Sequence, residues 1–355
     1  MQDSAESQPA PVPPSTKFSG WNRVRDFVTG RWFFKTAFLV YFVFACVQLL
    51  RFLAWARDAG PYVGRPEIVG GLLPVGHFTS FFAFLKGGGF DDLLPAGLVI
   101  IIGALAVSLL FKRGFCGWIC PVGTVWEGFS AAGRALTKGR QVRVPKWLDW
   151  GGRGFRFLLT TLTVFLLLVI LPVQEAVDFR SLPYMWVADM KILTIMLQPT
   201  YLLVALFAGV LSMLFGPVWC RYLCPVGGLY AAVGELSPCK VVRNDGNCTH
   251  CSRCTKVCHA FVDVESKSVV RDTECDGCMD CVKVCPAENC LEAHGPAGVS
   301  IAPWVWPLLV VGLWLAIFSA AKLTGNWDTH LRPDDFKAAV KSGVLEQSSM
   351  PSSKP

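Results

Sequence analysis

Five long apolar segments, separated by stretches of polar residues, predict five helices that cross a membrane. A helix needs about 20 predominantly apolar residues to span the hydrocarbon core of a bilayer, which is about 30 Å thick. The segments lie at residues 36–56, 93–111, 157–173, 200–219 and 301–321. We therefore expect an α-helical polytopic membrane protein with about five transmembrane helices.

The first apolar segment also resembles a signal peptide, because a basic region precedes it. Ala54 and Ala56 have the small-x-small spacing of a cleavage site. Such a leader would be unusually long, which favours a helix that remains in the mature chain.

The polar stretches divide the chain into further units. The first 20 residues are rich in Pro, Ser and Gln and bury too little apolar surface to offset the entropy of ordering, so we expect a disordered tail at 1–20. The units that follow are a first membrane repeat at 21–130, a basic cytoplasmic loop at 131–154, a second membrane repeat at 155–238, a cysteine-rich domain at 239–296, the fifth membrane helix at 300–321 and a C-terminal tail at 322–355. For this last tail, docking to a partner and a solvated terminal helix are equally compatible with the sequence.

Composition agrees with a location in the lipid bilayer and excludes an ordinary soluble protein. Of the 355 residues, 53% are apolar and 17% are charged, and the mean hydropathy is +0.45. The net charge is +7. The basic residues lie beside the apolar segments, however, and no nucleic-acid-binding motif is present, so we expect no nucleic-acid partner.

Basic residues in the short loops predict the orientation in the cell inner (cytoplasmic) membrane. Loops rich in Lys and Arg face the cytoplasm. Such residues cluster before the first apolar segment and between the second and third. The cysteine-rich domain then also faces the cytoplasm, and the C-terminal tail lies on the opposite side.

A short motif occurs twice and indicates an internal duplication. The motif is C-x3-C-P, and its two copies comprise Cys116, Cys120 and Pro121, and Cys220, Cys224 and Pro225. Two apolar segments separate the copies, so both emerge on the same side of the membrane. We expect a duplicated two-helix unit, related by an axis along the membrane normal, with each proline in the first turn of a new helix.

Three roles are open for the four thiols of this repeat. If each helix continues through its motif, the two cysteines of one copy lie one turn apart on the same face. The thiols could meet as a site for a further cluster or metal, act as redox-active dithiols, or simply pack at a helix junction. The additional metal site is therefore a candidate.

Eight cysteines between residues 248 and 285 form two runs with the same C-x2-C-x2-C-x3-C spacing. This spacing is typical of bacterial ferredoxins with two [4Fe–4S] clusters, in which the fourth cysteine of each run binds the other cluster. One cluster would be held by Cys248, Cys251, Cys254 and Cys285, and the other by Cys275, Cys278, Cys281 and Cys258. Structural zinc uses cysteine pairs with a long spacer, and disulfide frameworks are typical of short secreted chains, so neither fits. We expect an α+β bacterial-type 2[4Fe–4S] ferredoxin domain, inserted before the last membrane helix.

Four other polar residues are weaker candidates for a functional role than the cysteines. His77 could contact a quinone headgroup, although an ordinary loop histidine fits its surroundings better. Asp91, Asp92 and Glu175 are candidate proton carriers.

The remaining cysteines and two histidines are also ambiguous. Cys46 fits a buried apolar position, whereas Cys239 and Cys290 flank the ferredoxin runs and could lie near a cluster. His250 and His259 accompany the first run, which already has its full set of thiols, so we expect surface or supporting roles for them.

The two C-x3-C-P motifs together with the double ferredoxin run resemble a known membrane family. They are similar to NapH-like polyferredoxins, the quinol dehydrogenase subunits of periplasmic nitrate reductase systems, with relatives in the membrane protein that supports nitrous oxide reductase and in an accessory protein of cytochrome oxidase assembly. The resemblance covers roughly residues 35–290. Two features depart from it: His259 stands where the first run usually has Pro, and a fifth span with a tail extends beyond the four-span pattern.

The resemblance implies a membrane-bound electron-transfer protein with two [4Fe–4S] clusters. Such proteins exchange electrons with the quinone pool and pass them to partner redox subunits of Fe–S or cytochrome c type. The chain would be a component of a quinol dehydrogenase rather than a stand-alone enzyme. The alternative is an accessory factor that uses the C-x3-C-P thiols in the assembly of a copper or haem–copper enzyme.

Charges near the two runs predict unequal cluster potentials, because nearby cations raise a cluster's potential and nearby anions lower it. Basic residues accompany the first run, and acidic residues accompany the second. They are Lys240, Arg243, Arg253 and Lys256 for the first, and Asp272, Glu274, Asp276 and Asp280 for the second.

Overall fold

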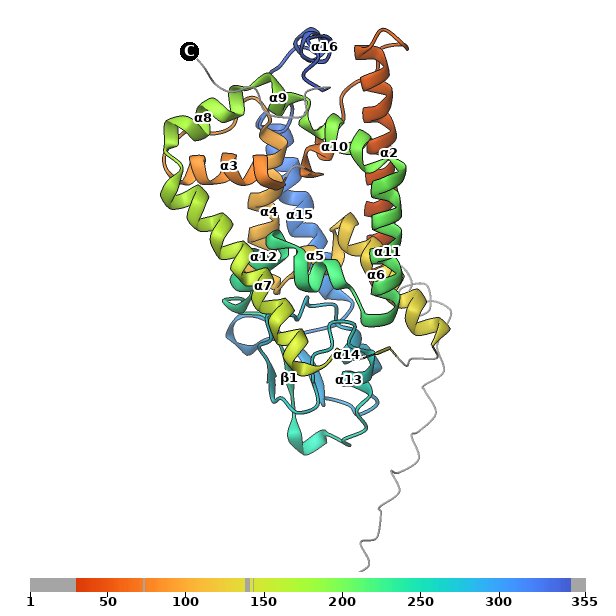
Figure 1. The fold of residues 1–355 in the computed structure, drawn as a ribbon. Coiled ribbons are helices and arrows are strands. Elements are labelled where there is room, and N and C mark those ends of the chain that lie inside the picture. Colours follow the sequence, from red (N-terminus) through yellow and green to blue (C-terminus); the bar gives the residue numbers. More distant parts are fainter. Residues whose placement is uncertain (1–29, 73, 138–140, 143, 346–355) are drawn as a thin grey trace, which may run out of the picture.

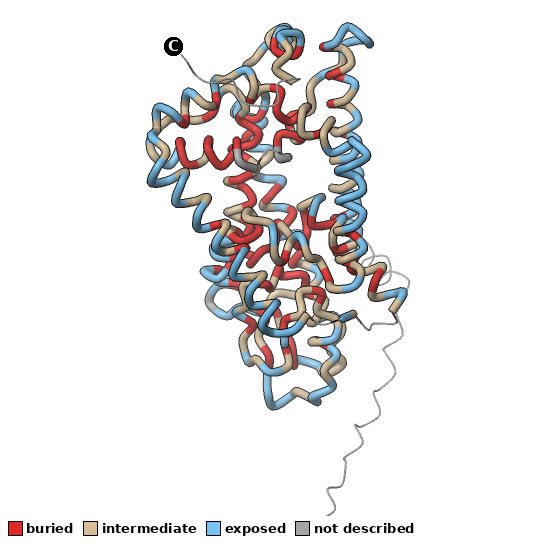
Figure 2. Tube along the Cα trace, viewed as in Figure 1, coloured by how far each residue is buried: buried red, intermediate tan, exposed pale blue. Residues whose placement is uncertain are grey.

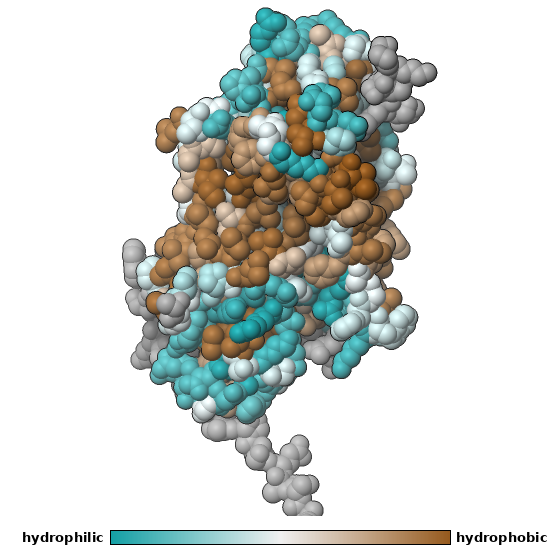
Figure 3. Space-filling model, turned by 90° about the vertical axis from the view of Figure 1, so that its left-hand side faces the viewer, coloured by the Kyte–Doolittle hydropathy of each residue, from teal (hydrophilic) through white to brown (hydrophobic). Residues whose placement is uncertain are grey.

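The computed structural model describes residues 30–72, 74–137, 141–142 and 144–345. The molecule is elongated, with a small cysteine-rich domain at one end and several short helices at the opposite end (Figure 1). On the face shown in Figure 3, a broad band of apolar residues lies between two hydrophilic ends. The tail predicted at 1–20 lies outside the described residues.

Three helices among the described residues are long and apolar enough to cross a membrane. They are α2 (Arg31–Ala56), α7 (Lys146–Phe165) with its continuation η2 (Leu166–Ile170), and α15 (Val305–Leu323). A fourth span results if α10 (Ala188–Met196) and α11 (Pro199–Phe215) are taken together, although they meet at a bend of 70°. The second predicted segment is α4 (Pro95–Phe111), a shorter apolar helix of 17 residues. Each predicted segment thus contains an apolar helix, and three to four of these helices qualify as spans.

The outer surfaces of these helices are apolar and exposed, as expected for contact with lipid. The tube in Figure 2 shows exposed residues along α2 and α11 and buried residues along α4 in the centre. Val40, Phe44, Leu203 and Phe207, for example, are all more than half exposed.

The predicted start of the third segment, at residue 157, is wrong because α7 begins at Lys146. A hydropathy pattern excludes the charged residues of the first turns, yet these residues are part of the helix because they form ion pairs. Asp149 pairs with Arg221 at 2.8 Å, and Arg156 pairs with Glu274 at 2.5 Å. Likewise, α2 begins five residues before the predicted boundary, and α15 begins only after a short strand.

The predicted duplication is visible in the helices. Helices α4 and α11 have 17 residues each, and each is followed by a five-residue helical segment and then by a longer helix, α6 (Pro121–Leu136) or α12 (Pro225–Glu235). The copies pack crosswise, because α6 lies against α11 and α12 lies against α4. Gly133 makes one crossing close: a Cβ atom there would lie 2.0 Å from the carbonyl oxygen of Met213. This crossing brings the two C-x3-C-P motifs together.

Each motif interrupts its helix, so the condition for placing its two cysteines one turn apart on a single continuous helix is not met. After α4, Lys112 has a φ of 60°, and a new short helix, α5 (Gly114–Trp118), begins. In the second copy, Gly216 has a φ of 90° and is followed by the wide turn η3 (Trp219–Leu223).

The second cysteine of each motif then starts a new helix. The N–H groups of Cys120 and Cys224 donate to carbonyl groups five residues earlier, at 3.0 and 2.9 Å. Both residues have extended backbones and cap the helices that follow. The predicted role of the prolines is confirmed, since Pro121 and Pro225 are the first residues of α6 and α12.

The cysteine-rich domain combines a four-stranded antiparallel sheet with two short helices. The strand order is β2 (Val269–Val270), β1 (Lys240–Arg243), β3 (Leu291–His294) and β4 (Ser300–Ile301). Val241 pairs with both Val270 and Ala293 and is buried with them in one core. The short helices are α13 (Arg253–Val257) and α14 (Asp280–Val284), and the turns η4 (Asp245–Asn247) and η5 (Pro296–Gly298) complete the domain.

The end opposite this domain is built from η1 (Glu67–Leu72), α3 (Pro74–Leu85), α8 (Val173–Ser181), α9 (Pro183–Trp186) and α16 (Pro333–Lys341). Helix α16 packs back on α2 and α9, and its Phe336 is 1% exposed. Helix α16 therefore buries one face against the rest of the molecule, and residues 346–355 of the predicted tail lie outside the described residues.

Candidate metal centres

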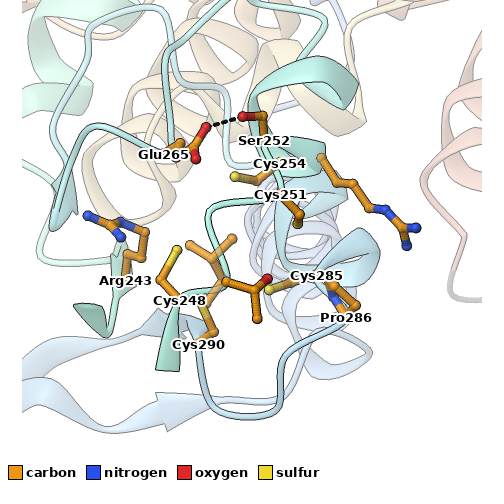
Figure 4. Close-up of a pocket in the computed structure, with 12 residues that line it drawn as sticks. Arg243, Cys248, Cys251, Ser252, Cys254, Glu265, Cys285, Pro286 and Cys290 are labelled. Carbon is orange, nitrogen blue, oxygen red and sulfur yellow. Dashed lines mark hydrogen bonds between the residues drawn. The ribbon is translucent and has the colours of Figure 1, made fainter. Parts of the chain in front are cut away.

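The first predicted set of four thiols lines one cavity in the cysteine-rich domain. Cys248, Cys251, Cys254 and Cys285 surround a common space (Figure 4). Cys254 is buried, Cys251 is exposed, and the other two are half-buried. This set therefore has one side open to solvent.

Two further side chains reach this cavity. Arg243 is 9% exposed and hydrogen-bonds with Cys248, and its Nη1 atom has no hydrogen-bond partner among the described residues. Burial opposes ionisation of Cys248, but the N–H of His250 and the guanidinium of Arg243 outweigh it and lower the pKa of this thiol. Cys290 is within hydrogen-bonding reach of Cys248 and Cys285. A buried cation beside thiols, which also pairs with Asp245, fits a cavity that holds an anionic group.

The second predicted set lines a separate cavity. Cys258, Cys275, Cys278 and Cys281 lie around it together with apolar side chains of the sheet and of the segments next to it. These apolar side chains are Val241, Val262, Val264, Val270 and Met279. The two cavities therefore divide the eight cysteines in the crossed manner that the spacing predicts, with the fourth cysteine of each run beside the other run.

The thiol sets are too widely spaced for a single metal ion. Four thiolates around one zinc ion, with Zn–S bonds of about 2.3 Å, have sulfur atoms within about 4 Å of one another. Among the described residues, no three sulfur atoms lie within 4.8 Å of each other. Thiols spread around a cavity fit the larger [4Fe–4S] cluster.

The four thiols of the repeated motif form a third group. Cys116, Cys120, Cys220 and Cys224 come from both copies, and each lies close enough to the other three to influence its ionisation. Sequence reasoning could not place the two copies in contact. The crosswise packing of α6 on α11 and α12 on α4 does so. We call this group the four-thiol site.

Two of these sulfur atoms lie at helix N-termini. Cys120 Sγ accepts from the N–H of Gly123 at 3.4 Å, and Cys224 Sγ accepts from the N–H of Gly227 at 3.2 Å. Both bonds are made at the first turn of α6 or α12, where the helix dipole favours negative charge. The two copies thus present equivalent sulfur acceptors to the same site.

As free thiols, these groups are poorly suited to dithiol chemistry. Reactive cysteines have a lowered pKa. Burial here raises the pKa of Cys116 to about 12 and raises the pKa values of the other three. Metal binding, by contrast, deprotonates thiols directly, and the guanidinium of Arg113 interacts favourably with the thiolates of Cys116 and Cys220. The donor set and this cation fit an anionic iron–sulfur cluster.

A buried ion triplet connects the four-thiol site to the second thiol set. Glu274, next to Cys275, accepts from Arg113 at 3.1 Å and from Arg156 at 2.5 Å. Arg156 also donates to the carbonyl of Cys220 at 3.2 Å. Removing one partner of a buried ion pair leaves an uncompensated buried charge.

A larger charge network lies on the other side of the same thiol set. Arg31, at the start of α2, pairs with Glu127 of α6 and with Asp276 (3.3 Å), and Lys35 pairs with Glu127 at 2.5 Å. His259 Nε2 lies 2.9 Å from Asp276 Oδ2. Burial would raise the pKa of Glu127, but His259, Arg31 and Lys35 outweigh it and hold this pKa at about 2.

This network affects the prediction of unequal cluster potentials, which was based on the charged residues near each cysteine run. Three of the four acidic residues assigned to the second run are paired with buried cations, since Asp280 also pairs with Arg31 at 3.1 Å. Sequence reasoning missed Arg31 and Glu127 because both lie far from the run along the chain. Unequal potentials stay a prediction, but charge counting within one run is not a sound reason for them.

The weaker sequence candidates have ordinary surroundings. His77 is in helix α3, not in a loop, and its Nε2 contacts the carbonyl of Gly70 while its ring packs against Gly97. This enclosure gives no support for contact with a quinone headgroup. Asp91 hydrogen-bonds with Ser80 at 2.5 Å and accepts from N–H groups before α4, which is a structural role.

The other candidates lie near the surface or in the core. Asp92 and Glu175 are exposed, and Cys46 is half-buried in α2. Cys239 is buried in the core of the cysteine-rich domain. His250 is exposed, as its expected surface role requires.

Two family profiles match the chain. One, described as a 4Fe-4S binding domain, matches residues 93–139 and again residues 197–243, which contain the two copies of the C-x3-C-P motif. The other, described as a 4Fe-4S dicluster domain, matches residues 240–286.

Several curated proteins are similar to the chain. YccM of Escherichia coli K12, to which its name ascribes electron transport, is 31% identical over 344 residues, which cover 92% of this chain and 93% of YccM. The ferredoxin-type protein NapH of the same organism is 26% identical over 46% of this chain and 55% of NapH. The methylamine utilization ferredoxin-type protein MauN of Methylorubrum extorquens is 27% identical over 56% of this chain and 68% of MauN. No solved structure matches the chain.

Proposed function

This chain belongs to the NapH-like family of 4Fe–4S membrane ferredoxins, and from that premise we propose that it passes electrons between the quinone pool and partner redox proteins through three iron–sulfur sites. Iron–sulfur electron transfer in a membrane protein follows from the family itself. The quinone, the third site and the partners, of Fe–S or cytochrome c type, are the parts that we propose.

The observation that carries the proposal is the meeting of four half-buried cysteines from both repeat copies beside the second thiol set. The four-thiol site follows the C-terminal ends of α4 and α11, and the cysteine-rich domain lies beyond it. Both copies also match a profile described as a 4Fe-4S binding domain. These features support a chain of redox sites that leads out of the membrane.

The residues of the chain would hold three clusters and set their surroundings. A [4Fe–4S] cluster on four thiolates supplies one-electron redox chemistry. Gly123 and Gly227 donate N–H groups to the sulfur atoms at the four-thiol site. Arg113 and Arg243 place buried positive charge beside thiols, and the valines that line the second cavity keep water from the second set. Hydrogen bonds and nearby cations of this kind favour the reduced, more negative state.

The rival function, assembly of a copper enzyme, has less support from the site. A copper(I) ion held by three thiolates needs all three sulfur atoms close together around it. No three such atoms are gathered within 4.8 Å among the described residues. Copper bound at the four-thiol site in place of iron would favour the rival.

We further propose that the iron–sulfur domain faces the cytoplasm and that α16 lies on the other side of the inner membrane. The two lie at opposite ends of the molecule, and the basic residues at the ends of the apolar helices near the iron–sulfur domain support this orientation. The C-terminal segment would then be periplasmic.

One experiment with membrane vesicles tests both the electron donor and the orientation of the protein in the membrane. Membrane vesicles that contain the protein are reduced anaerobically with a quinol analogue, and the cluster signals are followed by EPR. We expect quinol to reduce the signals in vesicles of both orientations. Ferricyanide, which does not cross membranes, should reoxidise them quickly only in inside-out vesicles. Signals that quinol leaves unreduced would contradict the quinone proposal, and rapid reoxidation only in right-side-out vesicles would contradict the orientation.

A further inference from the structure

The first copy of the C-x3-C-P motif contacts one specific loop of the cysteine-rich domain. Trp118, between the two cysteines of this copy, is fully buried and donates its indole N–H to the carbonyl of Gly277 at 3.0 Å. The neighbouring Gly117 lies so close that a Cβ atom there would be 2.6 Å from the carbonyl oxygen of Asp276. Both contacted residues lie between Cys275 and Cys278, which are thiols of the second set.

The second copy contacts the same thiol set from another direction. Arg221, between Cys220 and Cys224, donates to the carbonyl of Ala260 at 2.5 Å. Its guanidinium also lies 5.6 Å from the centre of the Phe261 ring. Ala260 is two residues after Cys258, the thiol that the first run contributes to the second set.

The first set is placed differently. Both cavities are lined by residues of the cysteine-rich domain alone, but the residues that contact the repeats, Ala260, Asp276 and Gly277, line the cavity of the second set and not that of the first. Cys251 is exposed to solvent there. The membrane repeats therefore hold the second set and leave the first set facing outward.

The two copies of the repeat differ in sequence at the residues that make these contacts. The offset that relates Cys116 to Cys220 also relates Gly117 to Arg221 and Trp118 to Tyr222. The cysteines and prolines are the same in both copies, but these two residue pairs differ. Tyr222 donates to Asp149 of α7 at 2.6 Å instead of to the cysteine-rich domain. Each copy thus has its own residue for docking this domain.

We propose that Trp118 and Arg221 are positioning residues that hold the second thiol set directly against the four-thiol site, which makes the second cluster the inner neighbour of that site. The first cluster, beside exposed Cys251, is then the outer terminus at which a water-soluble redox protein exchanges electrons with the chain. This inference rests on the proposed function, because it orders the three sites which that function requires.

The test compares two variants of the full-length protein in detergent. Trp118→Phe removes the indole donor to Gly277 and keeps an aromatic ring, and Tyr222→Phe removes a hydroxyl at the equivalent position of the other copy. The reduction midpoint of each cluster is measured by EPR titration. Signals are assigned with Cys251→Ser, which perturbs the first set only.

We expect Trp118→Phe to change the reduction equilibrium of the second cluster about threefold, or about 30 mV for one electron, and to leave the first cluster unchanged. Tyr222→Phe should leave both ferredoxin clusters unchanged. A shift of the first cluster in Trp118→Phe, equal shifts in both variants, or no shift of the second cluster would overturn the inference.

A measurement on the unaltered protein covers the case in which a variant does not fold. A water-soluble dysprosium chelate speeds the spin relaxation of clusters near solvent. We expect a stronger effect on the first cluster than on the second, and an equal or reversed effect would contradict the order. Failure of the proposed function is distinct, because the unaltered protein would then contain about eight irons per chain or fewer, or would resist reduction by quinol.

Discussion

Replacing Cys116 and Cys220 with alanine is expected to remove about four irons per chain and to stop quinol from reducing the ferredoxin clusters. A cluster at the four-thiol site would lose two of its four ligands, one from each repeat copy. Dithionite, which reaches the exposed first set directly, should still reduce the two ferredoxin clusters. The measurement is iron content together with EPR after each reductant.

Cys46→Ala is the matched control for this double variant. Cys46 is also a free thiol in a membrane helix, but it is half-buried in α2 and belongs to none of the three thiol sets. Its replacement should change neither the iron content nor the reduction by quinol. Full reduction by quinol in the double variant would remove the four-thiol site from the electron path.

The second large effect is expected from Arg31→Met. Arg31 is 3% exposed and pairs with Glu127, Asp276 and Asp280, and its Nε donates to the carbonyl of Gly117 at 2.9 Å. Its loss would leave Asp276 and Asp280 beside a thiol set with less positive charge to offset them. Removing one partner of a buried ion pair costs about 3–5 kcal/mol of stability.

This loss should be visible as earlier thermal bleaching of the clusters. For a chain of this size, we expect the midpoint of the loss of visible absorbance to fall by roughly 10 °C. Lys322→Met is the control, because Lys322 forms an ion pair with Asp328 at 2.6 Å in which both side chains are largely exposed, and such pairs contribute about 0–1 kcal/mol. Equal midpoints in Arg31→Met and the unaltered protein would show that the network does not hold the domain in place.

The sequence predicted the elements whose pattern is local. The positions of the apolar helices follow from hydropathy, and the starts of α6 and α12 follow from Pro121 and Pro225. The division of the eight ferredoxin cysteines between two cavities was also predictable, because the crossed ligation follows from the spacing of each run.

The features that depend on distant contacts were not predictable from those patterns. The helix break before Cys116 results from the backbone of Lys112, which has no local signature. The four-thiol site exists because α6 and α12 cross to the other copy, and a repeat by itself does not specify how its copies pack. The pairing of Arg31 with Asp276 joins residues 245 positions apart. A count of the charges near each run therefore omits a cation that lies beside the second set.

The presence of three iron–sulfur sites can be measured as the iron and acid-labile sulfide content of anaerobically purified protein. We expect about twelve irons and about twelve sulfides per chain, from three [4Fe–4S] clusters. A reproducible value of about eight of each, in protein whose two ferredoxin clusters are complete by EPR, would contradict this expectation and leave the thiols of the repeated motif without a cluster.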